Sequence, residues 1–146
     1  MRAAVFGFVV VTLAALPAIA DQGEVMKQGF ATRLIMEQPV TGNLTEINGH
    51  YKLRLSESVY QAGGWIGVHH HAGPGLRYVE SGTMTYVQAG LTRTYKAGDC
   101  FYESGAIQHT ARNDGNEPVH LLNFELLPVD WKGPSAYAVA DSITRH

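Results

Sequence analysis

The sequence predicts an all-β fold, a sandwich or closed barrel, from three observations. Glycine-containing turns recur at short intervals between residues 39 and 130, for example at Asn48-Gly49, Ser81-Gly82 and Ala97-Gly98-Asp99, and glycine supplies the positive φ that tight turns need. The segments between these turns have the length of strands, and several alternate with a period of two residues. We find no 3.6-residue periodicity in this region, so no helix is expected there.

The first twenty residues have the layout of a secretory signal peptide. Arg2 provides a basic start, residues 3–16 are almost all apolar, and Ala18-Ile19-Ala20 forms a cleavage site of small residues. The apolar run is shorter than the roughly 20 residues that a membrane-spanning helix needs, so cleavage after Ala20 is favoured over anchoring. The sequence therefore predicts a periplasmic or secreted protein with no membrane association after cleavage.

The mature chain, residues 21–146, is long enough for one domain with its own core. Residues 21–38 are expected to form an N-terminal arm, within which residues 26–37 fit either a short helix or a segment lying over the barrel. Residues 39–130 are expected to form the barrel. Residues 131–146 contain two early breakers, Gly133 and Pro134, and are expected to be a C-terminal tail that wraps the barrel or is partly disordered.

Three segments of the barrel region show the strand pattern most clearly. Residues 51–55 and 83–86 alternate strictly between the two faces of a strand. In residues 119–127, a single face carries His120, Leu122, Phe124 and Leu126. We therefore expect His120 to look into the barrel, where a hydrogen-bonded, partly buried histidine is favoured over a functional one.

Charge and motif content exclude several classes of function. The net charge is −2, and −3 once Arg2 is removed with the signal peptide, so neither nucleic acid nor an acidic membrane is an expected partner. Cys100 is the only cysteine, so no internal disulfide can form, and it is expected to be a small buried hydrophobe. The sequence has no nucleophile elbow, phosphate-binding loop or C-x-x-C pair. Any chemistry is therefore expected to depend on a metal.

Three consecutive histidines, His69, His70 and His71, carry the functional signal. Residues i and i+2 of a strand point to the same side, so His69 and His71 can face one interior point while His70 faces away. Two converging imidazoles make half a site for a first-row divalent metal. His109, after the turn at residues 104–108, is placed to supply a third nitrogen from a distant strand. Taken alone, the histidine run fits a solvated loop tip equally well.

The residues around these histidines form two motifs. The first, from Gly63 to Gly82, reads GGWIGVHHHAGPGLRYVESG, and the second, from Gly98 to Asn113, reads GDCFYESGAIQHTARN. Over roughly residues 39–128 they resemble the conserved motifs of the cupin superfamily, G-x5-H-x-H-x3,4-E-x6-G and G-x5-P-x-G-x2-H-x3-N. The resemblance implies a single jelly-roll barrel (a double-stranded β-helix) with one metal bound inside it. It also implies a small-molecule ligand or substrate and, as for many small cupins, a homodimer.

The chain departs from these motifs at three places. Counting back from Gly82, the family's glutamate falls on Gly75, so that carboxylate ligand is missing. Ser104 and Ala106 replace the proline and glycine of the second motif. Glu103 lies directly before this turn, where it could be a substitute metal ligand, an acid/base beside the metal, or an exposed residue.

Carried onto this chain, the resemblance gives His69, His71 and His109 as metal ligands, and Glu103 is added as the replacement for the missing carboxylate ligand. One divalent transition metal is the expected cofactor. Iron is preferred, with manganese, zinc, nickel or copper as alternatives. Glu103 and Tyr78 are the candidate catalytic residues, because a carboxylate or phenol that faces the metal could transfer a proton. Arg77, next to Tyr78, would suit an anionic substrate if it faced the pocket, and a solvated position is the alternative.

Two classes of function fit this pattern. The first is a mononuclear metal-dependent enzyme acting on a small molecule, either dioxygenase-like or a Lewis-acid lyase or isomerase. The second is a non-catalytic periplasmic module that binds a metal or small ligand, and a purely structural metal is a third possibility. A structural site is closed by four ligands, whereas the missing glutamate and the small Gly73-Pro74-Gly75 loop leave this one accessible. An enzyme is therefore favoured.

Overall fold

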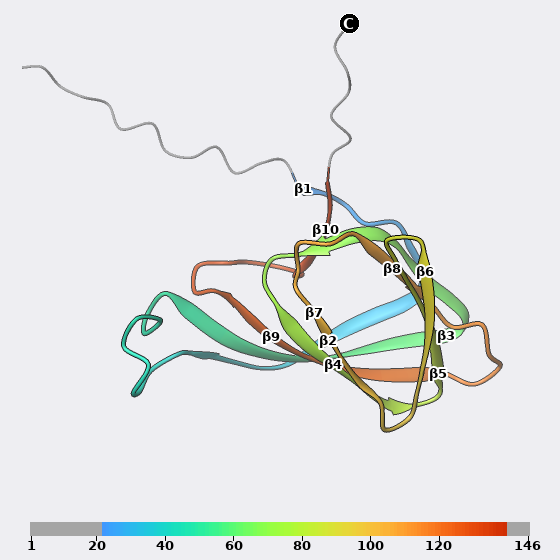
Figure 1. The fold of residues 1–146 in the computed structure, drawn as a ribbon, viewed down its shortest axis with the longest axis horizontal. Coiled ribbons are helices and arrows are strands. Elements are labelled where there is room, and N and C mark those ends of the chain that lie inside the picture. The colour runs from blue at the N-terminus through green and yellow to red at the C-terminus, as the bar shows by residue number, and fades with distance from the viewer. Residues whose placement is uncertain (1–21, 140–146) are drawn as a thin grey trace, which may run out of the picture.

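The computed structural model describes residues 22–139, and its strands pair entirely in antiparallel fashion (Figure 1). The described residues contain no helix, which confirms the all-β prediction. Over the same range, no helix is long and apolar enough to cross a membrane. The predicted signal peptide, residues 1–20, lies outside the described residues. The strands, in chain order, are β1 (Gln22–Gly23), β2 (Lys27–Pro39), β3 (Tyr51–His71), β4 (Gly75–Ser81), β5 (Thr83–Gln88), β6 (Leu91–Lys96), β7 (Cys100–Glu103), β8 (His109–Arg112), β9 (Val119–Pro128) and β10 (Ala136–Val139).

The strands curl into a nearly closed barrel of jelly-roll type (Figure 1). Their hydrogen-bonded order is β6-β5-β8-β3-β9-β4-β7, while β2 and β10 also pair with β3, and β1 pairs with β10. Most neighbours in this order, such as β3 and β8 or β4 and β9, are distant in sequence. This order places β3 next to β8, and β4 between β7 and β9, so that their inward-facing side chains meet in the interior.

A change of register within β3 decides which histidines face inward. In the first half of the strand the even-numbered residues are buried, for example Ser58 and Tyr60, and Ile66 continues this pattern. The pairing of β3 with β8 shifts between Ile66 and His69, which marks a β-bulge or irregularity. Beyond the shift it is odd-numbered His69 that is buried. Because an extra residue in a strand reverses the alternation of its faces, the shift directs His69 and His71 into the barrel.

The N-terminal segment is part of the sheet. A short helix was one expectation for residues 26–37, and it is wrong, because Lys27–Pro39 form β2 and pair with β3 over most of its length. Pairing with β3 satisfies the backbone groups of both strands, and this tertiary contact outweighs the weak local pattern. At the other end of the chain, β10 pairs with His70 and His71 of β3. The N-terminal segment and the tail therefore both contribute strands next to the barrel interior.

The prediction that His120 looks into the barrel is wrong. Burial along β9 falls on the opposite face, which carries Val119, Leu121, Asn123, Glu125 and Leu127. His120 lies on the outer face, where its Nδ1 is 2.9 Å from Oε1 of Glu57. The expectation for Cys100 is also wrong, since this residue is exposed. For His120 the period of two was correct, but it does not indicate which face is inside, and for Cys100 the usual burial of a lone cysteine does not hold.

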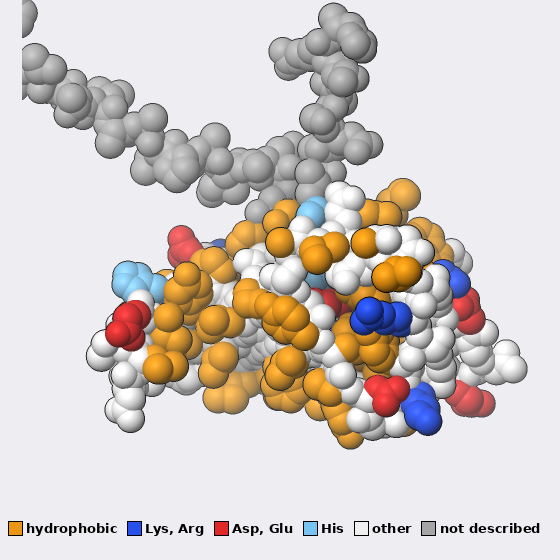
Figure 2. Space-filling model, viewed as in Figure 1, with side chains coloured by type: hydrophobic (Ala, Val, Ile, Leu, Met, Phe, Trp, Pro, Cys, Tyr) orange, Lys and Arg blue, Asp and Glu red, His pale blue; other side chains and the backbone are white. Residues whose placement is uncertain are grey.

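The outer face of the sheet carries an apolar row that crosses five strands. Its members are successive register partners: Tyr102, Leu76, Phe124, Leu55 and Met36. All five are large hydrophobic residues. Leu55 is partly buried, and the other four have 44–64% of their surface exposed. Hydrophobic side chains gather over this face in Figure 2. Exposed apolar surface of this kind is typical of association surfaces, and the homodimer stays a prediction.

Asn113, the last residue of the second motif, is expected to be important for stability. It is 1% exposed, and its Nδ2 donates to the carbonyl oxygens of Tyr60, Gln61 and Glu117. Replacing it with alanine leaves buried acceptors unpaired. We therefore expect Asn113→Ala to lower the free energy of unfolding by about 1–3 kcal/mol in chemical denaturation. Exposed Asn116→Ala is the control and should stay within about 0.5 kcal/mol of the parent. Equal stability of the two variants would contradict the role given to Asn113.

Candidate metal centre

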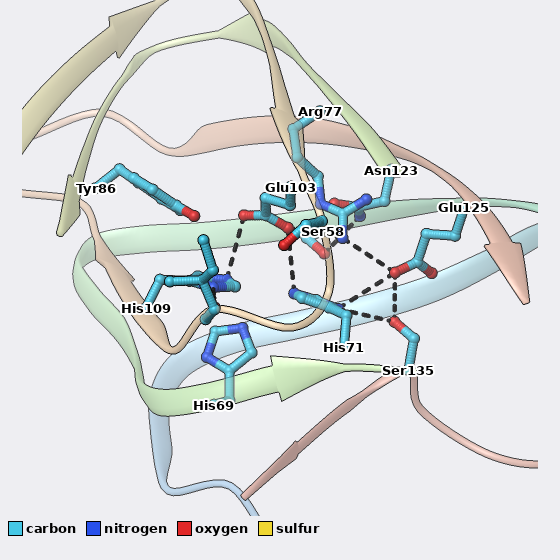
Figure 3. Close-up of polar contacts among 12 residues, drawn as sticks. Ser58, His69, His71, Arg77, Tyr86, Glu103, His109, Asn123, Glu125 and Ser135 are labelled. Atoms are coloured by element: carbon cyan, nitrogen blue, oxygen red, sulfur yellow. Dashed lines mark hydrogen bonds and ion pairs between the residues drawn. The ribbon is translucent and has the colours of Figure 1, made fainter. Parts of the chain in front are cut away.

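Three imidazoles meet in the interior of the barrel, as the sequence predicted. His69 and His71 come from β3 and His109 from the start of β8, and one ligand atom of each lies within 4.8 Å of the others. His69 and His109 are direct partners across the two strands, and their ring centroids are 4.2 Å apart. Figure 3 shows the three rings grouped together. His70 points away from them and stacks on Tyr137. This group can hold a metal ion.

Backbone carbonyl groups fix the tautomers of two of these histidines. Nδ1 of His69 lies 2.7 Å from the Gly67 oxygen, and Nδ1 of His109 lies 3.1 Å from the Ile107 oxygen. A carbonyl oxygen can only accept, so Nδ1 carries the proton and the lone pair is on Nε2. Burial lowers the pKa of His69 to about 2, helped by the two neighbouring imidazoles, and burial also lowers the pKa of His109. Both rings are therefore neutral and suited to bind a metal through Nε2.

His71 is oriented by side chains instead. Its Nδ1 lies 3.1 Å from Oγ of Ser135 and 3.3 Å from Oε1 of Glu125, and the Ser135 hydroxyl donates to the same carboxylate oxygen at 2.5 Å. Burial raises the pKa of Glu125, but hydrogen bonds from His71 and Ser135 and the charge of Arg77 outweigh it, so the pKa falls to about 2. Glu125 is therefore ionised, and its carboxylate accepts a hydrogen bond from Nδ1 of His71.

Glu103 is buried beside the histidines, so of the three alternatives for this residue the exposed one is wrong. Its side chain shares the inner face of β7 with Phe101 and is 4% exposed. Oε1 lies 3.2 Å from Nε2 of His109, and Oε2 lies 3.3 Å from Nε2 of His71. Oε2 is also 2.8 Å from Nη2 of Arg77, yet it has no partner in hydrogen-bond geometry.

This arrangement fits a divalent metal. A buried carboxylate oxygen without a hydrogen bond is unfavourable, and a cation between Glu103 and the imidazoles would satisfy it. Neutral imidazole nitrogens and one carboxylate are donors that first-row divalent metals accept. Whether Glu103 is itself a ligand stays a prediction.

The space left by the missing glutamate of the first motif is filled by an arginine. In register, Gly75 of β4 stands between Glu103 of β7 and Glu125 of β9. A Cβ atom at Gly75 would come within 2.3 Å of Nη1 of Arg77 and 2.6 Å of the Phe124 oxygen. The Arg77 guanidinium is 1% exposed, and its Nη2 lies 2.8 Å from Glu103 and 3.1 Å from Glu125. The two neighbouring strands thus supply the carboxylates that β4 lacks. Arg77 faces the cavity, so the alternative of a solvated position is wrong.

The catalytic role predicted for Tyr78 is wrong, because Arg77 points inward and Tyr78 therefore points outward. Tyr78 is 39% exposed and does not line the cavity. The phenol at the site belongs to Tyr86 of β5, which is 4% exposed and stacks on His109 with ring centroids 5.0 Å apart. Burial and the nearby charge of Glu103 raise the pKa of Tyr86. Its hydroxyl therefore stays protonated and can donate a hydrogen bond towards Glu103 (Figure 3).

The candidate metal centre, His69, His71 and His109 with Glu103, lies on the wall of a cavity of about 800 Å³. Cavities of this size hold small organic molecules. Part of the wall is apolar and is made by Tyr60, Ile66, Met84, Phe101 and Leu121. Another part is polar and is made by Lys52, Arg54, Ser56, Ser58 and Asn123. Sequence reasoning missed Glu125, Ser135, Tyr86 and Asn123 as residues of this cavity.

Comparison with known proteins agrees with the fold. A sequence model of the cupin domain matches residues 56–125. The chain belongs to the cupin superfamily. No curated protein sequence matches it.

Many solved structures share this cupin fold. A cupin-like protein from Thermotoga maritima has a TM-score of 0.55 at 19% identity, covering 80% of this chain and 89% of its own. A cupin 2 conserved barrel domain protein from Salinispora arenicola has a TM-score of 0.53 at 17% identity, with coverage of 83% and 92%. Salicylate 1,2-dioxygenase from Pseudoaminobacter salicylatoxidans has a TM-score of 0.52 at 19% identity, with coverage of 66% and 26%. Identities this low establish the fold alone.

We expect His69→Ala and His109→Ala each to abolish metal binding, because each removes one of three converging nitrogens. His70→Ala is the matched control and should keep the stoichiometry of the parent, since His70 faces Tyr137. Elemental analysis of protein purified without a histidine tag measures the effect. Retained metal in both of the first two variants would contradict the site.

Ser135→Ala should weaken metal binding without abolishing it. The variant removes one of two groups that orient His71, and loss of such a partner typically lowers metal affinity about 10- to 100-fold. Competition with a chelator of known affinity measures the change. Ser81→Ala, at an exposed position, is the control. An unchanged affinity in Ser135→Ala would show that Glu125 alone orients His71.

Proposed function

We propose that this protein is an exported, mononuclear metal-dependent enzyme of dioxygenase-like type that acts on a small molecule. The observation that supports this function most strongly is the placement of the metal centre. Three converging imidazoles and an incompletely satisfied carboxylate face a cavity of about 800 Å³, whereas a structural metal is enclosed by its ligands. Export rests on the signal peptide expected in residues 1–20.

In this proposal His69, His71 and His109 hold the metal through Nε2, and Glu103 holds it through a carboxylate oxygen. Iron is the preferred metal, with manganese, zinc, nickel or copper as alternatives. When bound there, the metal would supply redox chemistry towards O₂ and Lewis acidity towards the substrate.

The chain's own residues have three tasks in this proposal. The Nδ1 partners keep each imidazole in one orientation, so that the donors are preorganised. Apolar side chains such as Met84, Phe101 and Leu121 exclude water from part of the cavity. Tyr86 offers a protonated hydroxyl and Glu103 a carboxylate oxygen, so one group can donate a proton and the other can accept one.

A Lewis-acid lyase or isomerase is the second candidate, and the pairing of Tyr86 with Glu103 favours it. Such reactions need a proton removed at one substrate atom and delivered at another, which a phenol beside a carboxylate can do. The dioxygenase form has an analogy of fold in the salicylate 1,2-dioxygenase, and fold analogy does not fix a reaction.

Metal content and oxygen uptake test the proposal together. Residues 21–146 are purified without a tag, loaded with iron under anaerobic conditions and mixed with diketones, thiols or phenols in air. We expect about one iron per chain and oxygen uptake with at least one substrate class. Tight zinc, nickel or copper without oxygen uptake would favour the lyase, isomerase or non-catalytic binding function. If no metal is bound, either after purification or after loading with iron, the proposal is overturned.

Glu103→Gln separates the two roles of this carboxylate. If Glu103 is a ligand, the variant should lose about tenfold or more in metal affinity along with turnover. Metal affinity is measured by chelator competition, and Glu80→Gln, at an exposed position, is the control. Unchanged affinity with lost turnover would make Glu103 a proton-transfer residue only. If neither quantity changes, Glu103 has no role in the site.

A further inference from the structure

A second group of charged side chains lines the same cavity, away from the histidines in sequence. Lys52 and Arg54, here called the cation pair, face inward from β3, and Glu37 of β2 lies against both. Their side chains are only 6% and 10% exposed, against 28% for Glu37. Two cations are therefore shielded from water next to one half-exposed carboxylate.

The hydrogen bonds of the cation pair leave donors available. Lys52 Nζ donates to Glu37 at 3.2 Å and to the Trp131 oxygen at 2.6 Å. Arg54 donates from Nε to Glu37, and from Nη1 to the Gly133 oxygen at 2.8 Å. Nη2 of Arg54 makes no hydrogen bond within residues 22–139. A planar guanidinium with a free amino group is well suited to a carboxylate or phosphate oxygen.

The cation pair and the metal centre lie on one continuous wall. Arg54 stands directly opposite Glu125 in the pairing of β3 with β9, and Glu125 contacts His71. The next inward residues of β3 are Ser56 and Ser58, which pack with Asn123 through hydrogen bonds. These neutral polar groups can donate hydrogen bonds to carbonyl oxygens, and they can donate hydrogen bonds to hydroxyl groups or accept them. A small molecule anchored at Arg54 can therefore extend towards the histidines along polar contacts.

We propose that Lys52 and Arg54 form an anion subsite and that the substrate is a small organic carboxylate. The carboxylate of the substrate is held by the cation pair, and the remainder of the molecule extends into the cavity towards the metal centre. The word substrate rests on the proposed function, but binding at the cation pair needs no metal.

The test compares benzoate with benzamide, which have the same shape and differ in charge. Binding to the full mature chain, treated with a chelator to remove metal, is followed by calorimetry and by the fluorescence of Trp131, which lines the cavity. We expect benzoate to bind at least about tenfold more tightly than benzamide, and Arg54→Gln to remove that preference. Arg33→Gln is the control, because Arg33 pairs with Glu57 on the outer face and is 70% exposed.

Two further variants keep the test decisive if Arg54→Gln does not fold. Arg54→Lys retains the charge and should retain the preference for benzoate, whereas Lys52→Met should reduce it. Equal affinities for benzoate and benzamide, or full benzoate binding in Arg54→Gln, would overturn the subsite. Benzoate binding that appears only with metal and is lost in His109→Ala would place the carboxylate on the metal and would also overturn it. The proposed function fails separately from the subsite: a chain that prefers benzoate but shows no metal-dependent turnover would contradict only the proposed function.

Discussion

The buried guanidinium of Arg77 is the contact on which the rest of the site depends. It lies between two carboxylates from different strands, Glu103 and Glu125, and both of these contact His71. Three charged groups can be withdrawn from water together only when they compensate one another. Without the guanidinium, two carboxylates would face each other in a poorly solvated interior, and protonation of one of them would disturb the orientation of the histidines. The electrostatics of the metal centre thus start from a residue that need not touch the metal.

The fold supplies this contact through strand order and register. Placing β4 between β7 and β9 sets the two glutamates on either side of Gly75, and the register shift in β3 directs His69 and His71 towards them. Each feature depends on pairings between segments far apart in the chain. A local slip of one residue would move a ligand to the outer face of the sheet. The precision of the site is therefore a property of the whole sheet.

The histidine group and the all-β fold could be predicted from the sequence, because spacing of i and i+2 and recurrent turns are local signals. The residues that orient the histidines could not. Glu125 sits in a strand whose apolar residues made the other face look like the interior, and Ser135 reaches the site from a tail without a clear pattern. Tyr78 was predicted to face the metal, and Tyr86 does so instead, because alternation predicts two faces without saying which is inside. The inward face of β9 carries the buried polar residues Asn123 and Glu125, so hydrophobicity alone does not identify the inner face of this strand.

The close approach at Gly75 also bears on how such a site can change over generations. Restoring the acidic residue of the first motif would drive a side chain into the Arg77 guanidinium and the Phe124 carbonyl oxygen. A glutamate at position 75 therefore requires Arg77 to change first, and that step would expose Glu103 and Glu125 to each other. Both single steps are unfavourable, although the double change is chemically sensible. The two positions are therefore epistatic: while Arg77 fills the gap, an acidic side chain is accommodated on β7 and not at position 75 of β4.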